Sequence, residues 1–420
     1  MVNQEMSRRT LLKGGGAAIA GLSALEVAGP AHAFPGGPGE EVIPWLDPPP
    51  PNPVPGAVGK LLDWEALDSW LTPADNFFTI NHYGEPAVDA VNWRLGIGGL
   101  VARPQSLALA DLRARPRREV TFALECSGNH GFPFFIGAVG NARWAGTSLA
   151  PLLERAGILE QGTEVVFWGA DSGRVTIRDN GGVLRPGTSG EVVPDADGNL
   201  DLTITEQFAR SMSLEDALNG DNLLCYEMNG VPLRGEHGFP LRLIAPGWYG
   251  VANVKWLTRI EVMDQRYAGR FMARDYVTIR EQVRDGQIVW TFNTVKHDRL
   301  KSAPAKVTRR RGRYAVMGAA WGAPIAEVEV QIDDGPWMTA TLEDQPRRTG
   351  RSRARTEFAW RFWTLQWGKP AAGEHTIRSR AFDVDGNVQP PPDDPYLASK
   401  VTYWEGNGRI ARRVAIPAGD

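Results

Sequence analysis

The 420-residue chain has only two cysteines, Cys126 and Cys225, and neither belongs to a Cys-x-x-Cys motif. The missing motif argues against a zinc ribbon and against covalently attached c-type haem, so we expect no haem in this chain. The net charge of -3 is too small to indicate binding to nucleic acid or to an anionic membrane surface. No apolar run reaches the ~20 residues of a membrane span, and we expect none in the mature protein. The composition is typical of a globular protein with room for two domains.

The first 33 residues have the pattern of a targeting segment. Paired arginines and leucines at 7–13 precede a Gly/Ala-rich stretch at 14–28 and an Ala-His-Ala cleavage motif at 31–33. This pattern predicts a twin-arginine signal peptide over 1–33 and a periplasmic or otherwise exported protein. The alternatives are a Sec signal with coincidental arginines and an uncleaved membrane helix. Twin-arginine export carries folded proteins, often because a cofactor is inserted before export.

Composition divides the rest of the chain into three parts. A Pro/Gly-rich stretch over 34–60 predicts an extended arm or linker, and folded domains are expected at 61–290 and 300–415. In the last part, short alternating runs separated by Asp-Gly turns predict a β-sandwich. With helices expected in the first domain, the fold class is predicted as α+β.

Local patterns in the first domain predict individual elements. Apolar runs at 121–124 and 164–171 indicate buried strands. Helical spacing at 148–156 stops at a glycine, and 204–212 also has the pattern of a short helix. The stretch 179–201 is rich in Gly, Pro, Asp and Ser, which predicts an exposed insertion.

Cys126 follows the apolar run at 121–124 and begins a turn through Ser127, Gly128 and Asn129. The ordinary interpretation of one such cysteine is a small buried residue with an inert thiol. In an exported chain, however, an isolated cysteine on a turn suggests a thiolate that something other than a second cysteine protects. A metal ion would do so, because a thiolate is a soft metal ligand.

Several separated motifs resemble the sulfite oxidase family of molybdopterin-dependent oxidoreductases. They are ECSGN at 125–129, ARWAG at 142–146, CYEMNGVPLRGEHGFPLR at 225–242, NVKWL at 253–257 and the tail at 316–390. The resemblance extends from about Leu61 to the C-terminus. The family's exported members include sulfite and sulfane dehydrogenases. The resemblance implies a molybdopterin-binding domain, then an immunoglobulin-like dimerisation domain and hence a homodimer.

The resemblance also implies roles for individual residues. Cys126 would be the single protein ligand to molybdenum, while the pterin supplies two further sulfurs and carries a phosphate. Tyr226 matches the active-site tyrosine, Trp144 would wall the substrate pocket, and Cys225 would be a structural thiol. The residues expected to bind the cofactor are Asn81, His82, Asp171, His237, Arg242 and Lys255. Any one of them, taken alone, is more often a surface or structural residue.

Two departures from the family pattern concern the substrate. Sulfite-oxidising relatives have arginines where this chain has Ile80 and the pair His130-Gly131. Arginine suits a dianionic oxyanion, so the replacements predict a less basic, more apolar pocket. The remaining donors would be His130 and Arg143. The candidates for the family's C-terminal arginine are Lys400 and Arg409.

These features predict an exported molybdenum-cofactor oxidoreductase that acts on sulfite or a related small sulfur compound. Electrons would pass to a separate carrier, such as a c-type cytochrome. One alternative is a cysteine-dependent hydrolase that uses Cys126 with His130 or His237. Another is a cofactor-binding interaction protein with altered or lost sulfite activity.

Overall fold

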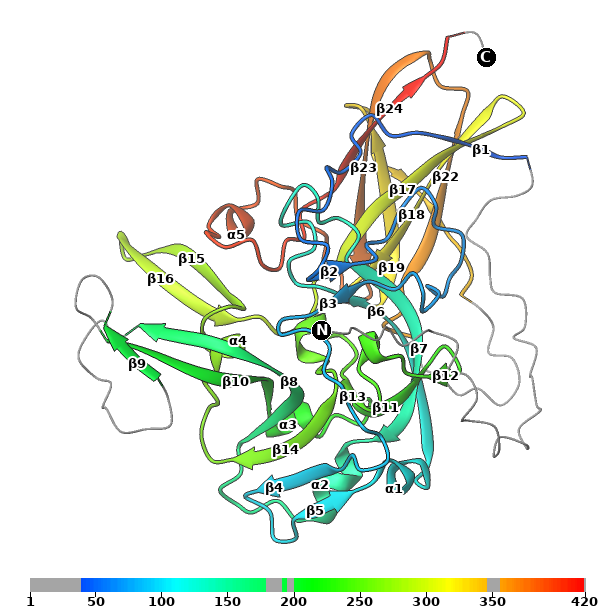
Figure 1. Cartoon of the computed structure of the whole chain (residues 1–420). Helices are drawn as coiled ribbons and strands as arrows, with labels where there is room; N and C mark the ends of the chain where they lie inside the picture. Colours follow the sequence, from blue (N-terminus) through cyan, green and yellow to red (C-terminus); the bar gives the residue numbers. More distant parts are fainter. Residues whose placement is uncertain (1–38, 179–190, 195–199, 346–355, 419–420) are drawn as a thin grey trace, which may run out of the picture. The chain divides into compact units, whose positions relative to one another are not determined.

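The computed structural model describes residues 39–178, 191–194, 200–345 and 356–418 (Figure 1). The predicted signal peptide and most of the predicted insertion at 179–201 lie outside these residues. Strands dominate the described part, and its five α-helices have only four to seven residues each. The α+β prediction therefore overstated the helical content. No helix in the described part is long and apolar enough to cross a membrane.

The first domain contains a six-stranded mixed sheet in the order β5-β4-β14-β8-β10-β9. Only β14 and β4 run parallel to each other. The strands are β4 (Leu95–Gly99), β5 (Gln105–Leu107), β8 (Glu164–Arg178), β9 (Glu191–Pro194), β10 (Leu200–Ser213) and β14 (Leu257–Met263). The predicted strand at 164–171 is confirmed as the first half of β8.

The helix predicted at 204–212 is wrong, because these residues belong to β10. Ile204 pairs with Val175 and Met212 with Val165 along the neighbouring strand β8. The sheet provides a hydrogen-bond partner along nearly the whole strand, and this tertiary pairing overrides local helical spacing. The helix predicted at 148–156 is confirmed as α2 (Ala150–Ala156), which ends at Gly157 with a φ of 71°.

A second, five-stranded sheet positions the Cys126 turn. Four of its strands have the order β12-β11-β7-β6, and the fifth, β13, pairs with β11. They are β6 (Arg117–Glu125), β7 (Val139–Ser148), β11 (Leu223–Met228), β12 (Val231–Pro232) and β13 (Arg242–Ile244). The run predicted as a buried strand forms the buried second half of β6. Because this half of the strand is buried, it fixes the position of Cys126, the residue that follows it.

Short elements surround these sheets and lead to the second domain. The helices are α1 (Leu109–Arg113), α3 (Leu214–Ala217), α4 (Arg270–Ala273) and α5 (Pro395–Ala398), with the 3-10 turns η1 (Gly235–His237) and η2 (Gly250–Ala252). The strands β2 (Val58–Gly59) and β3 (Thr79–Ile80) form one pair. A separate hairpin joins β15 (Val277–Arg284) to β16 (Gln287–Thr294).

The second domain consists of a five-stranded and a four-stranded antiparallel sheet. The first has β1 (Glu41–Ile43), β17 (Lys301–Arg310), β18 (Arg313–Trp321), β22 (Arg361–Gly368) and β21 (Thr341–Leu342). The second has β20 (Met338–Thr339), β19 (Ile325–Ile332), β23 (Gly373–Asp383) and β24 (Ala411–Ile416). Inward residues such as Val316, Val328 and Val414 form one core from both sheets. Alternation along β19 buries Val328 and Val330.

The proline-rich arm at 34–60 is not a free linker throughout its length. Its strand β1 pairs with β17. Ile43 and Trp45 are buried in the core of the second domain, and the Trp45 indole donates to the carbonyl of Ala305 at 3.0 Å. Apolar side chains within an otherwise polar, proline-rich stretch therefore attach the arm to the second domain.

Candidate active site

Cys126 follows β6 directly and is held by main-chain hydrogen bonds. Its N–H donates to the carbonyl of Ala138 at 2.9 Å, and its carbonyl accepts from the N–H of Asn129 at 2.9 Å. Burial, with the neighbouring Glu125 carboxylate, raises the pKa of the Cys126 thiol to about 12. Without a metal or another positive partner, this thiol is therefore protonated at neutral pH. The other cysteine, Cys225, is also buried and free.

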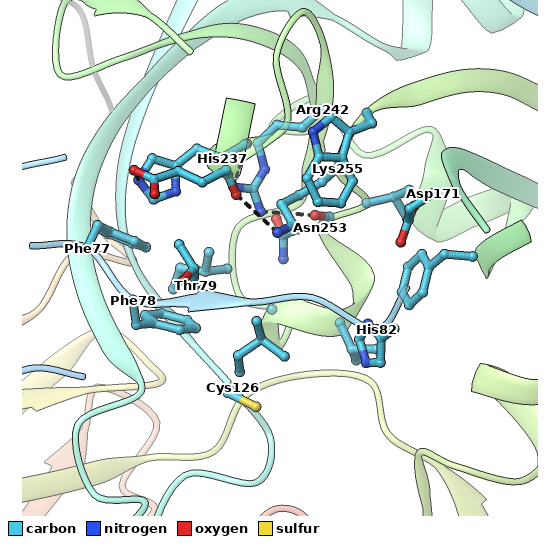
Figure 2. A pocket seen from close by; sticks show the side chains of 18 of the residues that line it. Phe77, Phe78, Thr79, His82, Cys126, Asp171, His237, Arg242, Asn253 and Lys255 are labelled. Atoms are coloured by element: carbon cyan, nitrogen blue, oxygen red, sulfur yellow. Dashed lines mark hydrogen bonds and ion pairs between the residues drawn. The ribbon is translucent and has the colours of Figure 1, made fainter. Parts of the chain in front are cut away.

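Cys126 lines a pocket with an empty volume of about 650 Å³, part of it open to solvent (Figure 2). Five other residues selected from the sequence line the same pocket: His82, Asp171, His237, Arg242 and Lys255. They come from different loops and strands, yet the fold brings them around one cavity. Asn81 does not line it but accepts a hydrogen bond from the Lys255 ammonium.

Lys255 and Arg242 are the cationic side chains in the pocket wall. The Lys255 ammonium also donates to the carbonyl of Glu236 at 3.0 Å and lies 4.2 Å from the centre of the Trp256 ring. Burial, with Arg242 nearby, lowers the pKa of Lys255 to about 7. An anionic group bound here would stabilise the charged ammonium and raise this pKa.

Arg242 is buried, and two of its nitrogens donate to the carbonyls of His237 and Asn253 at 3.1 and 3.0 Å. Its guanidinium lies 4.9 Å from the ring centre of Trp144. Trp144 itself is completely buried and does not line the pocket. The expectation that Trp144 forms a wall of the substrate pocket is therefore wrong. Its indole instead packs against the Arg242 guanidinium.

The two pocket histidines are neutral at physiological pH. Burial lowers the pKa of both His82 and His237 to about 4. His82 Nε2 lies 2.7 Å from the hydroxyl of Tyr276, and His237 Nε2 lies 2.9 Å from the carbonyl of Ala74. Burial also raises the pKa of Asp171 to about 6.

The tyrosine of the pocket is Tyr276 rather than Tyr226. Tyr226 does not line the pocket; its ring is packed in the main core of the first domain, with the Arg113 guanidinium 5.6 Å from the ring centre. The prediction that Tyr226 faces the reacting group is therefore wrong. Tyr276 lines the pocket and comes immediately before β15. A polar aromatic residue at the start of a strand was the only local signal for it.

His130 lies away from the pocket. Its ring centre is 6.5 Å from that of Trp321 in β18, and its Nδ1 atom is buried without a hydrogen-bond partner in the described part. The prediction that His130 is a catalytic donor is contradicted by this position. A Cβ at the adjacent Gly131 would lie 2.7 Å from the carbonyl oxygen of Tyr403, so this site has no room for an arginine side chain.

The other positions that the sequence suggested for substrate binding supply no cationic side chain to the pocket. Ile80 is part of the wall, as expected for a less basic cavity. Lys400 donates to the carbonyls of Trp404 and Glu405 at 2.9 and 3.1 Å, while Arg409 donates to the carbonyl of Gln389 at 3.2 Å. Neither Lys400 nor Arg409 lines the pocket, and the same holds for Arg143.

A buried charged cluster beside Cys126 was not anticipated from the sequence. The Glu125 carboxylate accepts from Lys301 Nζ at 2.5 Å, from Asn129 Nδ2 at 2.9 Å and from Trp321 Nε1 at 2.9 Å. Glu125 and Lys301 are 0% and 1% exposed. The second domain, through β17 and β18, therefore supplies two of the three groups that hold the residue before Cys126.

Comparison with known proteins agrees with this geometry. The domain described as "Oxidoreductase molybdopterin binding domain" matches residues 82–271, and the "Mo-co oxidoreductase dimerisation domain" matches 291–402. Sulfite oxidase from Gallus gallus is 34% identical over 349 residues, which cover 77% of this chain and 69% of that protein. The chain belongs to the sulfite oxidase family. It is a molybdopterin-dependent oxidoreductase.

The match covers different shares of other relatives. Mitochondrial sulfite oxidase from Homo sapiens is 32% identical over 350 residues, and the match covers 77% of this chain but only 58% of the human protein. Among solved structures, the sulfane dehydrogenase SoxCD from Paracoccus pantotrophus matches with a TM-score of 0.67 and 25% identity. That match covers 90% of this chain and 91% of the other.

The pocket residues fit molybdopterin. Cys126 supplies the soft sulfur that molybdenum prefers, and Arg242 and Lys255 supply charges suited to a phosphate. Arg242 Nε and Asp171 Oδ1 are buried without hydrogen-bond partners in the described part, as expected where a bound group completes the bonding. When bound, the cofactor supplies two-electron redox chemistry. His82, His237 and Asn81 complete the set of residues that would hold it.

Proposed function

We propose that this oxidoreductase oxidises sulfite, or a related small sulfur compound, and passes the electrons to a separate carrier protein. The observation that carries the proposal is the single pocket that Cys126 shares with Arg242 and Lys255. For sulfite, one water supplies the oxygen, and the products are sulfate, two protons and two electrons. The sulfur compounds named for the relatives support this substrate class.

In the proposed reaction, Tyr276 and His82 take part in proton transfer. Their 2.7 Å hydrogen bond holds the phenol at the pocket wall. The low pKa of His82 leaves its ring neutral and able to accept a hydrogen bond from the phenol or to donate one to it. Tyr276 is thus placed to orient the substrate oxygen or to transfer a proton released when water is consumed.

The wall composition extends the proposed substrate range beyond sulfite. Ile80, Phe78 and Val251 contribute apolar surface to the pocket. A dianion would meet fewer arginines here than the family pattern provides, whereas a sulfur compound with lower charge or an apolar substituent would lose less solvation. We therefore include related small sulfur compounds as substrates.

The proposal includes the cellular setting. The paired arginines and cleavage motif of the first 33 residues support export by the twin-arginine pathway to the periplasm. The match to a dimerisation domain supports a homodimer, and the two packed sheets support an immunoglobulin-like form for this domain. A c-type cytochrome is the proposed electron acceptor.

The decisive experiment compares Cys126→Ser with Cys225→Ser. Metal analysis of the purified proteins should show molybdenum in the wild type and in Cys225→Ser, but a loss of at least about tenfold in Cys126→Ser, because a hydroxyl is a poor substitute for a soft thiolate. Sulfite-dependent reduction of cytochrome c should disappear with the metal. Full molybdenum content and normal turnover in Cys126→Ser would contradict the assignment.

The same samples test the hydrolase alternative, which the geometry does not favour. In the described part, His82 and His237 bond to other groups, and no hydrogen bond joins a histidine to Cys126. Iodoacetamide should alkylate the metal-bound Cys126 much more slowly than a free nucleophilic thiol. Cofactor binding without turnover on any sulfur compound would instead indicate a protein that has kept the site and lost the reaction.

A further inference from the structure

A second hollow, with an empty volume of about 1260 Å³ that is partly open to solvent, lies outside the Cys126 pocket and shares no lining residue with it. Its lining residues come mainly from the hairpin β15–β16, the chain at 296–299 and the region of α5. Figure 1 labels the hairpin strands and α5. Four cationic side chains, Arg266, Arg280, Lys296 and Arg299, line it together with two acidic ones, Asp298 and Glu405.

Two of the arginines are held on one tyrosine ring. The guanidinium carbons of Arg280 and Arg299 lie 4.0 and 5.3 Å from the ring centre of Tyr396. Arg299 also donates to the Tyr396 hydroxyl at 2.7 Å. The ring thereby positions both guanidinium groups, and it brings two like charges together at a cost that a bound anion would relieve.

The acidic groups neutralise only part of this cluster. Glu405 forms an ion pair with Arg299 at 3.5 Å and accepts from the Thr278 hydroxyl at 2.5 Å. Arg266 pairs with Glu164 at 3.4 Å. Burial, with the Glu125 carboxylate next in effect, raises the pKa of Asp298 to about 8, so this carboxyl is mostly protonated at neutral pH. The positive charge of the hollow therefore exceeds the negative charge.

Two donors in the hollow lack acceptors. Within the described residues, the Lys296 ammonium has no hydrogen bond or ion pair, and the buried Nε of Arg280 has no partner. Hydrogen-bond donors are therefore available in the hollow.

We propose that this hollow binds a small divalent oxyanion between the guanidinium groups of Arg280 and Arg299 and the ammonium of Lys296. Guanidinium groups bind oxyanions through paired hydrogen bonds, and a preorganised pair loses little conformational freedom on binding. Sulfate, sulfite and phosphate share the required chemistry. The Glu405 N–H donates to the carbonyl of Ser127 at 2.7 Å, which connects the wall of the hollow to the Cys126 turn. The site itself does not depend on the identity of the oxidised substrate.

Calorimetric titration of the purified, cofactor-containing protein tests the proposal. Sulfate, sulfite and phosphate are titrated separately at constant ionic strength, with acetate as a monovalent control; their relative affinities identify the preferred oxyanion. We expect sulfate binding in the wild type and roughly tenfold or greater weakening in Arg280→Met/Arg299→Met, because charge-assisted hydrogen bonds are lost. Lys296→Met should weaken binding severalfold. The matched control is Lys369→Met, an exposed lysine that does not line the hollow, and it should bind normally.

Unchanged sulfate affinity in Lys296→Met and in the double arginine variant would overturn the proposal, as would the absence of sulfate binding in the wild type. If the double variant does not fold, Lys296→Met decides the question, because its ammonium makes no hydrogen bond or ion pair within the described residues. A selenate soak with anomalous diffraction supplies an independent position. Metal content and turnover of the same preparations show separately whether the proposed oxidoreductase function holds.

Discussion

Tyr226 and Tyr276 show how the position of a single side chain in the fold decides its role. Tyr226 stands in a long recognisable motif, yet its ring packs beside Arg113 in the core. Tyr276 has little local signal, but its hydroxyl reaches His82 at the pocket wall. Cys225 and Tyr226 pack in different apolar clusters, although the register of β11 shifts between Cys225 and Glu227. The motif did not show which face meets the pocket.

This contrast yields a prediction at the residue scale. Tyr276→Phe should lower the turnover number by roughly 10²-fold if the hydroxyl takes part in proton transfer. The lost hydrogen bond should cost only about 1 kcal/mol of stability. Tyr226→Phe should leave turnover nearly unchanged. Steady-state assays with sulfite and thermal unfolding of both variants provide the measurements, and equal effects on turnover would contradict the assignment.

At the scale of elements, the end of β6 depends on β17 and β18. Glu125 closes the strand, while Lys301 and Trp321 reach its carboxylate from the second domain. A carboxylate that is completely buried would be strongly destabilising without such partners. The turn carrying Cys126 is therefore stabilised by residues 176 and 196 positions after Glu125 in the chain.

Removing one partner should expose this dependence. Lys301→Met leaves Glu125 buried and uncompensated, and we expect a loss of about 3–5 kcal/mol in the free energy of unfolding. Combining it with Glu125→Gln should recover part of the loss. As a control, Arg309→Met removes the more exposed pair with Glu41, where about 0–1 kcal/mol is expected. Denaturant unfolding measures all four proteins; similar losses for Lys301→Met and Arg309→Met would argue against a special role for the buried pair.

At the scale of the whole described chain, the two domains share apolar packing as well as this ion pair. Trp64 and Trp70 from the first domain pack in one cluster with Trp321 and Trp360 from the second, and the rings of Trp64 and Trp321 are stacked 5.7 Å apart.

Burial in and around the first domain also leaves several titratable groups with shifted pKa values. Stability should consequently depend on pH.

The pocket histidines give this dependence a defined sign. Their pKa falls from 6.5 in the unfolded chain to about 4 in the folded one. Between these values the unfolded state binds more protons, so the histidine contribution to stability is complete above about pH 6.5 and decreases as the pH falls toward 4. Asp298, with a raised pKa, has the opposite sign.

A variant isolates the histidine effect. His82→Asn/His237→Asn should lose less stability than the wild type between pH 6.5 and 4, even if it is less stable at pH 7. Chemical unfolding of the cofactor-free proteins across this range measures the difference. Parallel stability curves for wild type and variant would show that these rings do not govern the acid response.

Much of the candidate site could be predicted because its residues stand on turns and strand ends with distinctive local sequence. Cys126, His237, Arg242 and Lys255 belong to such motifs, and the fold places all four around one pocket. The α2 helix and the buried part of β6 were likewise predictable, since their spacing and their ends are local properties.

The family motifs, the cysteine on its turn and the apolar runs of the strands are local features that can be recognised in the sequence. Three features follow from the fold instead: 204–212 is a strand, Tyr276 faces the pocket and Lys301 neutralises Glu125. Each of these depends on contacts between segments distant in the chain. Local spacing carries no information about which partner a strand pairs with or which buried charge finds its counterion.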